Sequence, residues 1–171
     1  MFCESPEFRP APRPDGSEAW RATHSLGGCH PMAERYLGGM TTARKLLHTR
    51  YRVNELERTV NFYREVLGLQ EVRRHKSPRG SELVFLKAPE SEELIEICHF
   101  PESGPVQVQP DLTHLAFLVD SLDDFGAHLA KLGLSYSDGP RMKPDGSGFA
   151  FIDAPEGYEI ELMQNARKGG A

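Results

Sequence analysis

The chain has 171 residues, a length that suits one domain or two small modules with a shared core, and 39% of it is hydrophobic. It carries 25 acidic and 20 basic residues, and no stripe of lysine and arginine is interleaved with aromatics, which argues against nucleic acid as a partner. No apolar run approaches the roughly 20 residues of a membrane span, and three irregularly spaced cysteines indicate reduced thiols. We therefore expect a cytoplasmic protein with no membrane partner.

The first segment of the chain, 1–43, is rich in proline and glycine and lacks any sustained periodicity. Such a segment buries too little apolar surface to offset the entropy lost on ordering. We expect a disordered or loosely docked tail at 1–43 and a single domain at 44–166. Within the domain, we expect one module at 45–100, a linker at 101–111 and a second module at 112–164, with a short C-terminal tail at 165–171.

The first module is predicted to contain a strand, a helix and three further strands. The strands are predicted at 46–53, 69–76, 82–88 and 93–99. The helix is predicted to begin after an N-cap at Asn54 and to end at about Leu67, with Gly68 as its left-handed cap. Its apolar residues recur at helical spacing and predict a buried stripe of Leu56, Val60, Tyr63 and Leu67.

The second module repeats this order. Its strands are predicted at 112–120, 135–137, 148–153 and 158–163, with a flexible loop at 137–149 near the cleft. Its helix is predicted to run from an N-cap at Ser121 to about Leu132, with a buried stripe of Leu122, Phe125, Leu129 and Leu132. A βαβββ unit leaves one sheet face bare, so we predict an α+β fold in which two such modules in tandem form a cleft.

Two histidines and two glutamates occupy equivalent places in this repeat. His48 lies 66 residues before His114, and Glu96 lies 65 residues before Glu161. Each lies in a predicted strand, where an unpaired polar group facing a core costs on the order of 2 to 7 kcal/mol. Any one of them alone is better explained as a polar residue on a solvated sheet face. Their repetition instead favours a shared divalent cation.

The donor set narrows the choice of cation. Nitrogen and oxygen ligands without a thiolate favour Zn, Ni, Co, Mn or Fe(II) over Ca and Mg, which prefer oxygen alone. Four protein ligands leave room for water or substrate only in a shell expanded to about five or six. A metal of this kind polarises a carbonyl, and a carboxylate at its edge can move a proton between neighbouring carbons.

Several segments resemble glyoxalase I of the vicinal oxygen chelate superfamily. They are LLHTRYRV, RTVNFYREVLGL, LIEIC, THLAFLVD and FIDAPEGYEIEL, and the resemblance covers 46–164. Sister families such as extradiol dioxygenases and fosfomycin-resistance proteins generally use two histidines and one late glutamate. Methylmalonyl-CoA epimerase usually has glutamine at the place of Glu96, so Glu96 favours glyoxalase I.

This resemblance implies a homodimer in which each active site takes ligands from both chains. The implied metal ligands are His48, Glu96, His114 and Glu161. The resemblance also implies that Arg52 meets a carboxylate of glutathione, and that the metal is Ni or Co in preference to Zn. The family commonly has Asn where this chain has Phe100, and basic residues where it has Gln109-Pro110-Asp111. These departures bear on glutathione specificity.

We therefore expect a lactoylglutathione lyase activity, which isomerises the hemithioacetal of methylglyoxal and glutathione to S-lactoylglutathione. Glu161 is the expected base and Glu96 the second acid/base, because a weakly held carboxylate can leave the metal. The alternatives are an epimerase or Fe(II) dioxygenase of the same superfamily, and a module that binds a metabolite or drug without turnover. Arg50 is read either as a second anion clamp or as a solvated arginine, and Cys98 as a buried structural thiol.

Overall fold

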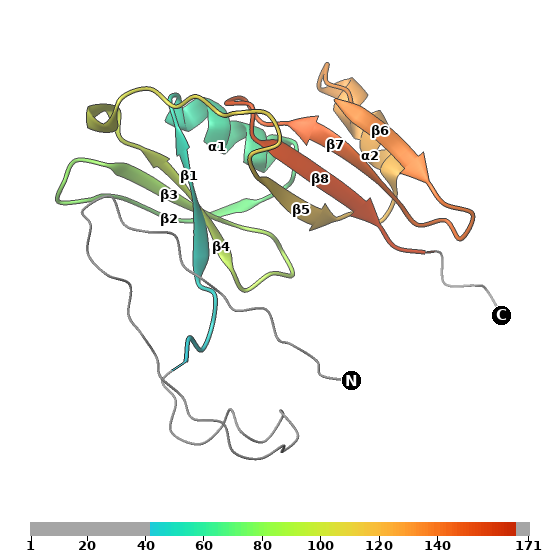
Figure 1. The fold of residues 1–171 in the computed structure, drawn as a ribbon, viewed down its shortest axis with the longest axis horizontal. Coiled ribbons are helices and arrows are strands. Elements are labelled where there is room, and N and C mark those ends of the chain that lie inside the picture. The colour runs from blue at the N-terminus through green and yellow to red at the C-terminus, as the bar shows by residue number, and fades with distance from the viewer. Residues whose placement is uncertain (1–41, 167–171) are drawn as a thin grey trace, which may run out of the picture. The chain divides into compact units, whose positions relative to one another are not determined.

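The structure is a computed structural model that describes residues 42–166, so the tail predicted at 1–43 lies almost entirely outside the described residues. Two four-stranded sheets make up the described part, each with one helix against one of its faces (Figure 1). The predicted α+β fold with two βαβββ modules is thus confirmed. None of the helices in 42–166 has the length and apolar character needed to cross a membrane.

Module one contains β1, α1 and three further strands in the predicted order. Their bounds are β1 His48–Val53, α1 Leu56–Glu65, β2 Gln70–Lys76, β3 Glu82–Lys87 and β4 Leu94–His99. The sheet order is β1-β4-β3-β2, with β1 parallel to β4 and the other pairs antiparallel. The first and last strands of the module therefore lie side by side, although more than forty positions separate them in the chain.

Module two repeats this topology. Its bounds are β5 His114–Leu118, α2 Leu122–Lys131, β6 Asp138–Met142, β7 Gly148–Asp153 and β8 Glu159–Gln164. The sheet order is β5-β8-β7-β6, again with the first and last strands parallel. The linker between the modules includes a short 3-10 helix, Pro101–Ser103.

Both helices cover one face of their sheets, and a single hydrophobic cluster runs through both modules. Val60 and Tyr63 of α1 and Leu122 and Leu129 of α2 are fully buried in it, as the helical spacing predicted. Leu132 was predicted to be buried with them, but it lies just past the end of α2 and is 42% exposed. The helix ends one residue too early to direct this side chain inward.

The helix starts were predicted correctly in one module only. Ser121 caps α2 as predicted, because its hydroxyl accepts a hydrogen bond from the backbone N–H of Asp124 at 3.1 Å. Asn54 does not cap α1: the N-cap is Glu55, and its own side chain makes no capping hydrogen bond. The Asn54 side chain instead exchanges two hydrogen bonds with the backbone of Val106 in the linker, at 2.7 and 3.0 Å.

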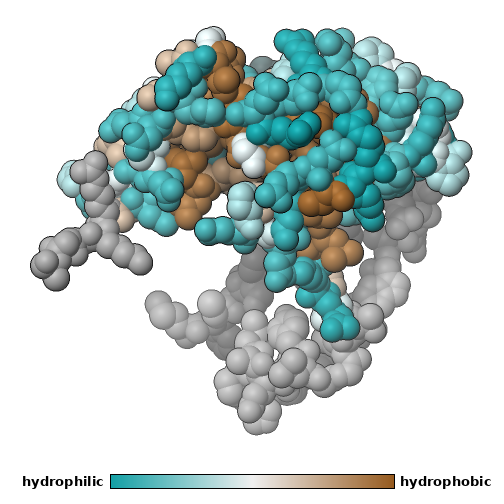
Figure 2. Space-filling model, turned by 180° about the vertical axis from the view of Figure 1, so that it is seen from behind, coloured by the Kyte–Doolittle hydropathy of each residue, from teal (hydrophilic) through white to brown (hydrophobic). Residues whose placement is uncertain are grey.

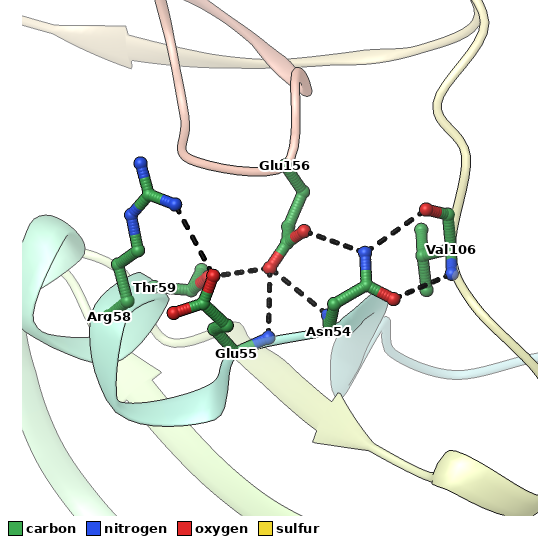
Figure 3. A network of polar contacts seen from close by, with 6 residues as sticks. All are labelled: Asn54, Glu55, Arg58, Thr59, Val106 and Glu156. Atoms are coloured by element: carbon green, nitrogen blue, oxygen red, sulfur yellow. Dashed lines mark hydrogen bonds and ion pairs between the residues drawn. The ribbon is translucent and has the colours of Figure 1, made fainter.

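A residue from the other module takes over the capping of α1 (Figure 3). Glu156, in the turn between β7 and β8, accepts hydrogen bonds from the backbone N–H groups of Asn54 and Glu55 at 3.0 and 3.1 Å. It also accepts from the Asn54 amide at 3.1 Å and from the Thr59 hydroxyl at 3.3 Å. One carboxylate therefore joins the start of α1 to module two, while Asn54 joins the same point to the linker.

The sixth strand was misplaced by the sequence analysis. It was predicted at 135–137, followed by a flexible loop at 137–149, whereas β6 occupies Asp138–Met142. This strand lies at the edge of its sheet, all its residues are exposed, and its pairing with β7 is irregular. An exposed edge strand carries no apolar alternation, so the polar sequence DGPRM resembled a loop.

Candidate metal-binding half-sites

The first predicted pair of ligands meets on module one. His48 begins β1 and Glu96 lies on the neighbouring strand β4, where parallel pairing sets Arg50 directly opposite Glu96. Side chains two apart in a strand share a face, so His48 and Arg50 project to the side of Glu96. The Nε2 atom of His48 lies 3.1 Å from Oε2 of Glu96. We call this pair half-site one.

The second pair repeats this arrangement on module two. His114 begins β5, Glu161 lies on β8, and the same parallel pairing places Ala116 opposite Glu161. The Nε2 atom of His114 lies 3.5 Å from Oε2 of Glu161. We call this pair half-site two, and it differs from the first chiefly in having Ala116 where half-site one has Arg50.

Both distances suit two ligands of one cation. Imidazole nitrogen and carboxylate oxygen bind divalent metals at about 2.0–2.2 Å, so adjacent ligands around such a metal lie roughly 3.0–3.5 Å apart. A hydrogen bond donated by the His48 N–H to the Glu96 carboxylate would give a similar N···O distance, so the first pair alone does not distinguish the two. The appearance of the same donor pair in both modules favours the cation, and the residues present therefore fit a metal.

Within a single chain the two half-sites do not form one site. Among residues 42–166, no group of three or more His, Cys, Asp or Glu side chains is close enough to hold a metal ion. The predicted ligands are therefore brought together two by two, His48 with Glu96 and His114 with Glu161. Among the described residues, the four predicted ligands thus lie in two separate pairs.

The two glutamates differ in their surroundings. The side chain of Glu96 is only 3% exposed, and that of Glu161 is 19% exposed. Arg50 Nε donates a hydrogen bond to Oε1 of Glu96 at 2.5 Å, which compensates the charge of the buried carboxylate. No such cation is opposite Glu161, because Ala116 occupies that place.

An aromatic ring supports each half-site, which the sequence analysis missed. Phe85 on β3 pairs with Glu96, and its ring meets the edge of His48 at a centroid distance of 5.6 Å. Phe151 on β7 stands in the same relation to Glu161 and His114, at 6.0 Å. The two phenylalanines are 66 residues apart, the same spacing as the histidines, and this repeat could have revealed them.

Arg52 is held by the linker. Its Nη2 atom donates hydrogen bonds to the carbonyl oxygens of Gly104 at 2.7 Å and Phe100 at 3.4 Å, and its buried Nε has no partner. Among the described residues no carboxylate forms an ion pair with it. The position and charge of its guanidinium are therefore compatible with the predicted anion contact.

Cys98 lies on the face of Glu96 but is packed in a small apolar cluster with Leu83 and Phe85. It is almost completely buried, as predicted for a structural thiol. Burial is the main reason that the pKa of its thiol is raised above the ordinary value.

The sequence profile of the Glyoxalase/Bleomycin resistance protein/Dioxygenase superfamily matches residues 45–162, most of the chain. The chain belongs to this superfamily. Within it, the chain is 31% identical over 130 residues to a lactoylglutathione lyase of Escherichia coli O157:H7, covering 73% of this chain and 96% of that protein. It is 32% identical over 133 residues to a probable lactoylglutathione lyase of Synechocystis, covering 72% and 97% respectively.

The fold of this superfamily member also matches solved structures. The trypanothione-dependent glyoxalase I of Leishmania major superposes with a TM-score of 0.60 at 30% identity, covering 71% of this chain and 87% of that chain. The predicted membership of the superfamily and its paired βαβββ modules are thus confirmed.

Proposed function

We propose that this protein is a metal-dependent lactoylglutathione lyase of the glyoxalase I type. The observation that carries the proposal is the repeated pairing of a histidine with a glutamate at equivalent places on the two sheets. The identity of about 30% to lactoylglutathione lyases across most of their length supports the same activity.

We infer a homodimer in which half-site one of each chain faces half-site two of its partner. One chain holds its four predicted ligands in two separate pairs. A site with four ligands would therefore form where half-site one of one chain meets half-site two of another. The strands that begin the modules, β1 and β5, are both sheet edges. Exposed leucines flank or lie on them: Leu46, Leu47, Leu112 and Leu118. Large exposed hydrophobic side chains that lie close together favour an interaction surface, and Figure 2 shows hydrophobic residues at the surface of the molecule.

The charges on the two sheet faces support the same pairing. Three arginines share the face of half-site one: Arg50, Arg52 and Arg73. Four carboxylates and one arginine share the face of half-site two: Asp138, Asp153, Glu159, Glu161 and Arg141. Opposite charges steer two surfaces together and disfavour contact between like modules. Module one of one chain is therefore better matched to module two of another than to a second module one.

The metal would be held by His48, Glu96, His114 and Glu161, with Ni or Co preferred over Zn. Bound there, it supplies Lewis-acid polarisation of the substrate oxygens. Glu161 takes the proton from the carbon that carries sulfur and returns it to the adjacent carbonyl carbon. The hydroxyl proton passes from the oxygen on the sulfur-bearing carbon to the oxygen on its neighbour. The hydroxyl and carbonyl thereby exchange places, and a hemithioacetal becomes a 2-hydroxyacyl thioester without net oxidation.

Arg52 would bind a carboxylate of the thiol cosubstrate. Its guanidinium is fixed at one end by the carbonyl groups of Phe100 and Gly104, and it lacks a carboxylate partner among the described residues. Charge-assisted hydrogen bonds from arginine to a carboxylate give both affinity and orientation. Phe100 and the segment Gln109-Pro110-Asp111 stand where the resemblance implies polar and basic residues, so they offer no positive charge to a glutathione carboxylate.

The test is an assay of metal-free protein reloaded with Ni, Co or Zn in turn, with methylglyoxal and glutathione as substrates. We expect thioester absorbance to rise with Ni or Co. Glu161→Gln should lower kcat by about 100-fold or more, as loss of a general base does. Glu82→Gln, which removes an exposed carboxylate on β3, serves as the control. Absence of thioester with all three metals refutes the substrate assignment.

A further inference from the structure

The two half-sites are unequal at one position. Arg50 on β1 and Ala116 on β5 occupy the same place in the repeat, two residues after the histidine and directly opposite the glutamate. Arg50 binds Oε1 of Glu96 at 2.5 Å, and His48 lies 3.1 Å from Oε2. Glu96 therefore has a partner on each oxygen, whereas His114 is the ion-pair partner of Glu161 in the described part of the chain.

Burial makes this difference important. The Glu96 side chain is 3% exposed and is surrounded on its face by Phe85 and Cys98, which offer it no compensating charge. A buried carboxylate is tolerated only when it is paired and hydrogen-bonded. Arg50 is itself 48% exposed, so its own charge remains solvated while it holds the carboxylate.

We propose that Arg50 is a positioning residue that fixes the carboxylate of Glu96 and so preforms half-site one for its metal. This proposal rests on the proposed function. Arg50 holds Oε1 of Glu96, so Oε2 stays beside the His48 ring. Oε2 is then the oxygen that would bind the metal. Half-site two has Ala116 in place of this partner, so Glu161 has one contact fewer to break, which suits the proton transfer assigned to it.

Two other roles for Arg50 make different predictions. A merely solvated arginine would contribute nothing to metal affinity. A cation that competes with the metal for Glu96 would weaken metal binding, so that its removal would tighten it. Groups that orient metal ligands from outside the coordination shell typically strengthen metal binding by about 10- to 100-fold.

The experiment measures Ni²⁺ binding to metal-free full-length protein by isothermal titration calorimetry, without any substrate. We expect Arg50→Met to weaken binding by about 10- to 100-fold. Arg50→Lys should be weakened less than Arg50→Met, because lysine keeps the charge but not the fixed geometry of the guanidinium. If Arg50→Met fails to fold, Arg50→Lys alone serves as the test. We then expect its affinity for Ni²⁺ to be about threefold or more below that of the wild type.

The control is Lys45→Met, which removes the cation of an ion pair with Glu92 just outside the same two strands. Glu92 is exposed, so this variant should bind Ni²⁺ as the wild type does. Unchanged or tighter binding by both Arg50 variants overturns the positioning role and leaves the proposed function standing. If the wild type itself binds no divalent metal, the proposed function fails and this role fails with it.

Discussion

At the residue scale, burial determines which polar groups this domain can hold. Three polar or charged residues are buried among those described, and they are Thr59, Ser81 and Glu96. The Thr59 hydroxyl donates to Glu156 of the other module and the Ser81 hydroxyl accepts from Ser77, whereas Glu96 is the one ionisable residue of the three. Its position was predictable because strand alternation and the repeat both pointed to it. Its burial and its contact with Arg50 were not, because they depend on strand pairing across more than forty residues.

Leu129 provides a direct test of the core. It is completely buried in α2, so Leu129→Ala should lower the free energy of unfolding by about 2–5 kcal/mol through lost burial and a residual cavity. Leu132→Ala should lower it by less than about 1 kcal/mol, because that side chain is largely exposed. Urea denaturation followed by circular dichroism measures both. Equal losses would show that α2 continues to Leu132 and buries it.

The thiol of Cys98 provides a test of pH dependence. Burial raises its pKa, and the thiolate is the form that reacts, so alkylation in the native protein should be slow at pH 8 and increase only at higher pH. Peptide mapping by mass spectrometry after iodoacetamide treatment reads Cys98 separately from Cys3 and Cys29. Protein unfolded in guanidinium chloride should react at the rate of an ordinary cysteine. Rapid native labelling of Cys98 at pH 7 would contradict its burial.

At the scale of elements, the two helix starts differ in how far sequence could predict them. Ser121 caps its own helix through a contact three residues away, and a local pattern of this kind is visible in sequence. The start of α1 is capped by Glu156, about one hundred residues later. Sequence alone assigned that role to Asn54, which instead binds the linker at Val106. The position of the edge strand β6 was also predicted wrongly, because this strand is formed by its pairing with β7 and its own sequence has no strand pattern.

The capping carboxylate should contribute measurably to stability. Glu156→Ala removes the partner of two backbone N–H groups at the start of α1, and we expect a loss of about 1–2 kcal/mol in the free energy of unfolding. Ser121→Ala, the matched change at α2, should lower it by about 1 kcal/mol. Both are measured by urea denaturation. A Glu156→Ala variant as stable as the wild type would show that this contact between the modules does not contribute to the free energy of unfolding.

At the scale of the whole molecule, the four predicted ligands of the repeat lie in two separate pairs on one chain. The sequence predicted the order of the modules correctly and singled out these four residues as candidate ligands, because the duplication repeats both at nearly constant spacing. It could not show that each pair forms within one module, which depends on β1 lying beside β4 and β5 beside β8. The unequal charges of the two faces also emerge only from the pairing of the strands.

The most direct test of this account is complementation between two inactive variants. One carries His48→Ala with Glu96→Gln, and the other carries His114→Ala with Glu161→Gln, so each lacks one half-site. Each should fold, form dimers and show no lyase activity alone. When the two are co-expressed, random pairing should restore about a quarter of the wild-type sites, because each mixed dimer holds one intact pair of half-sites. Mixed dimers that form but stay inactive would contradict a site shared between chains.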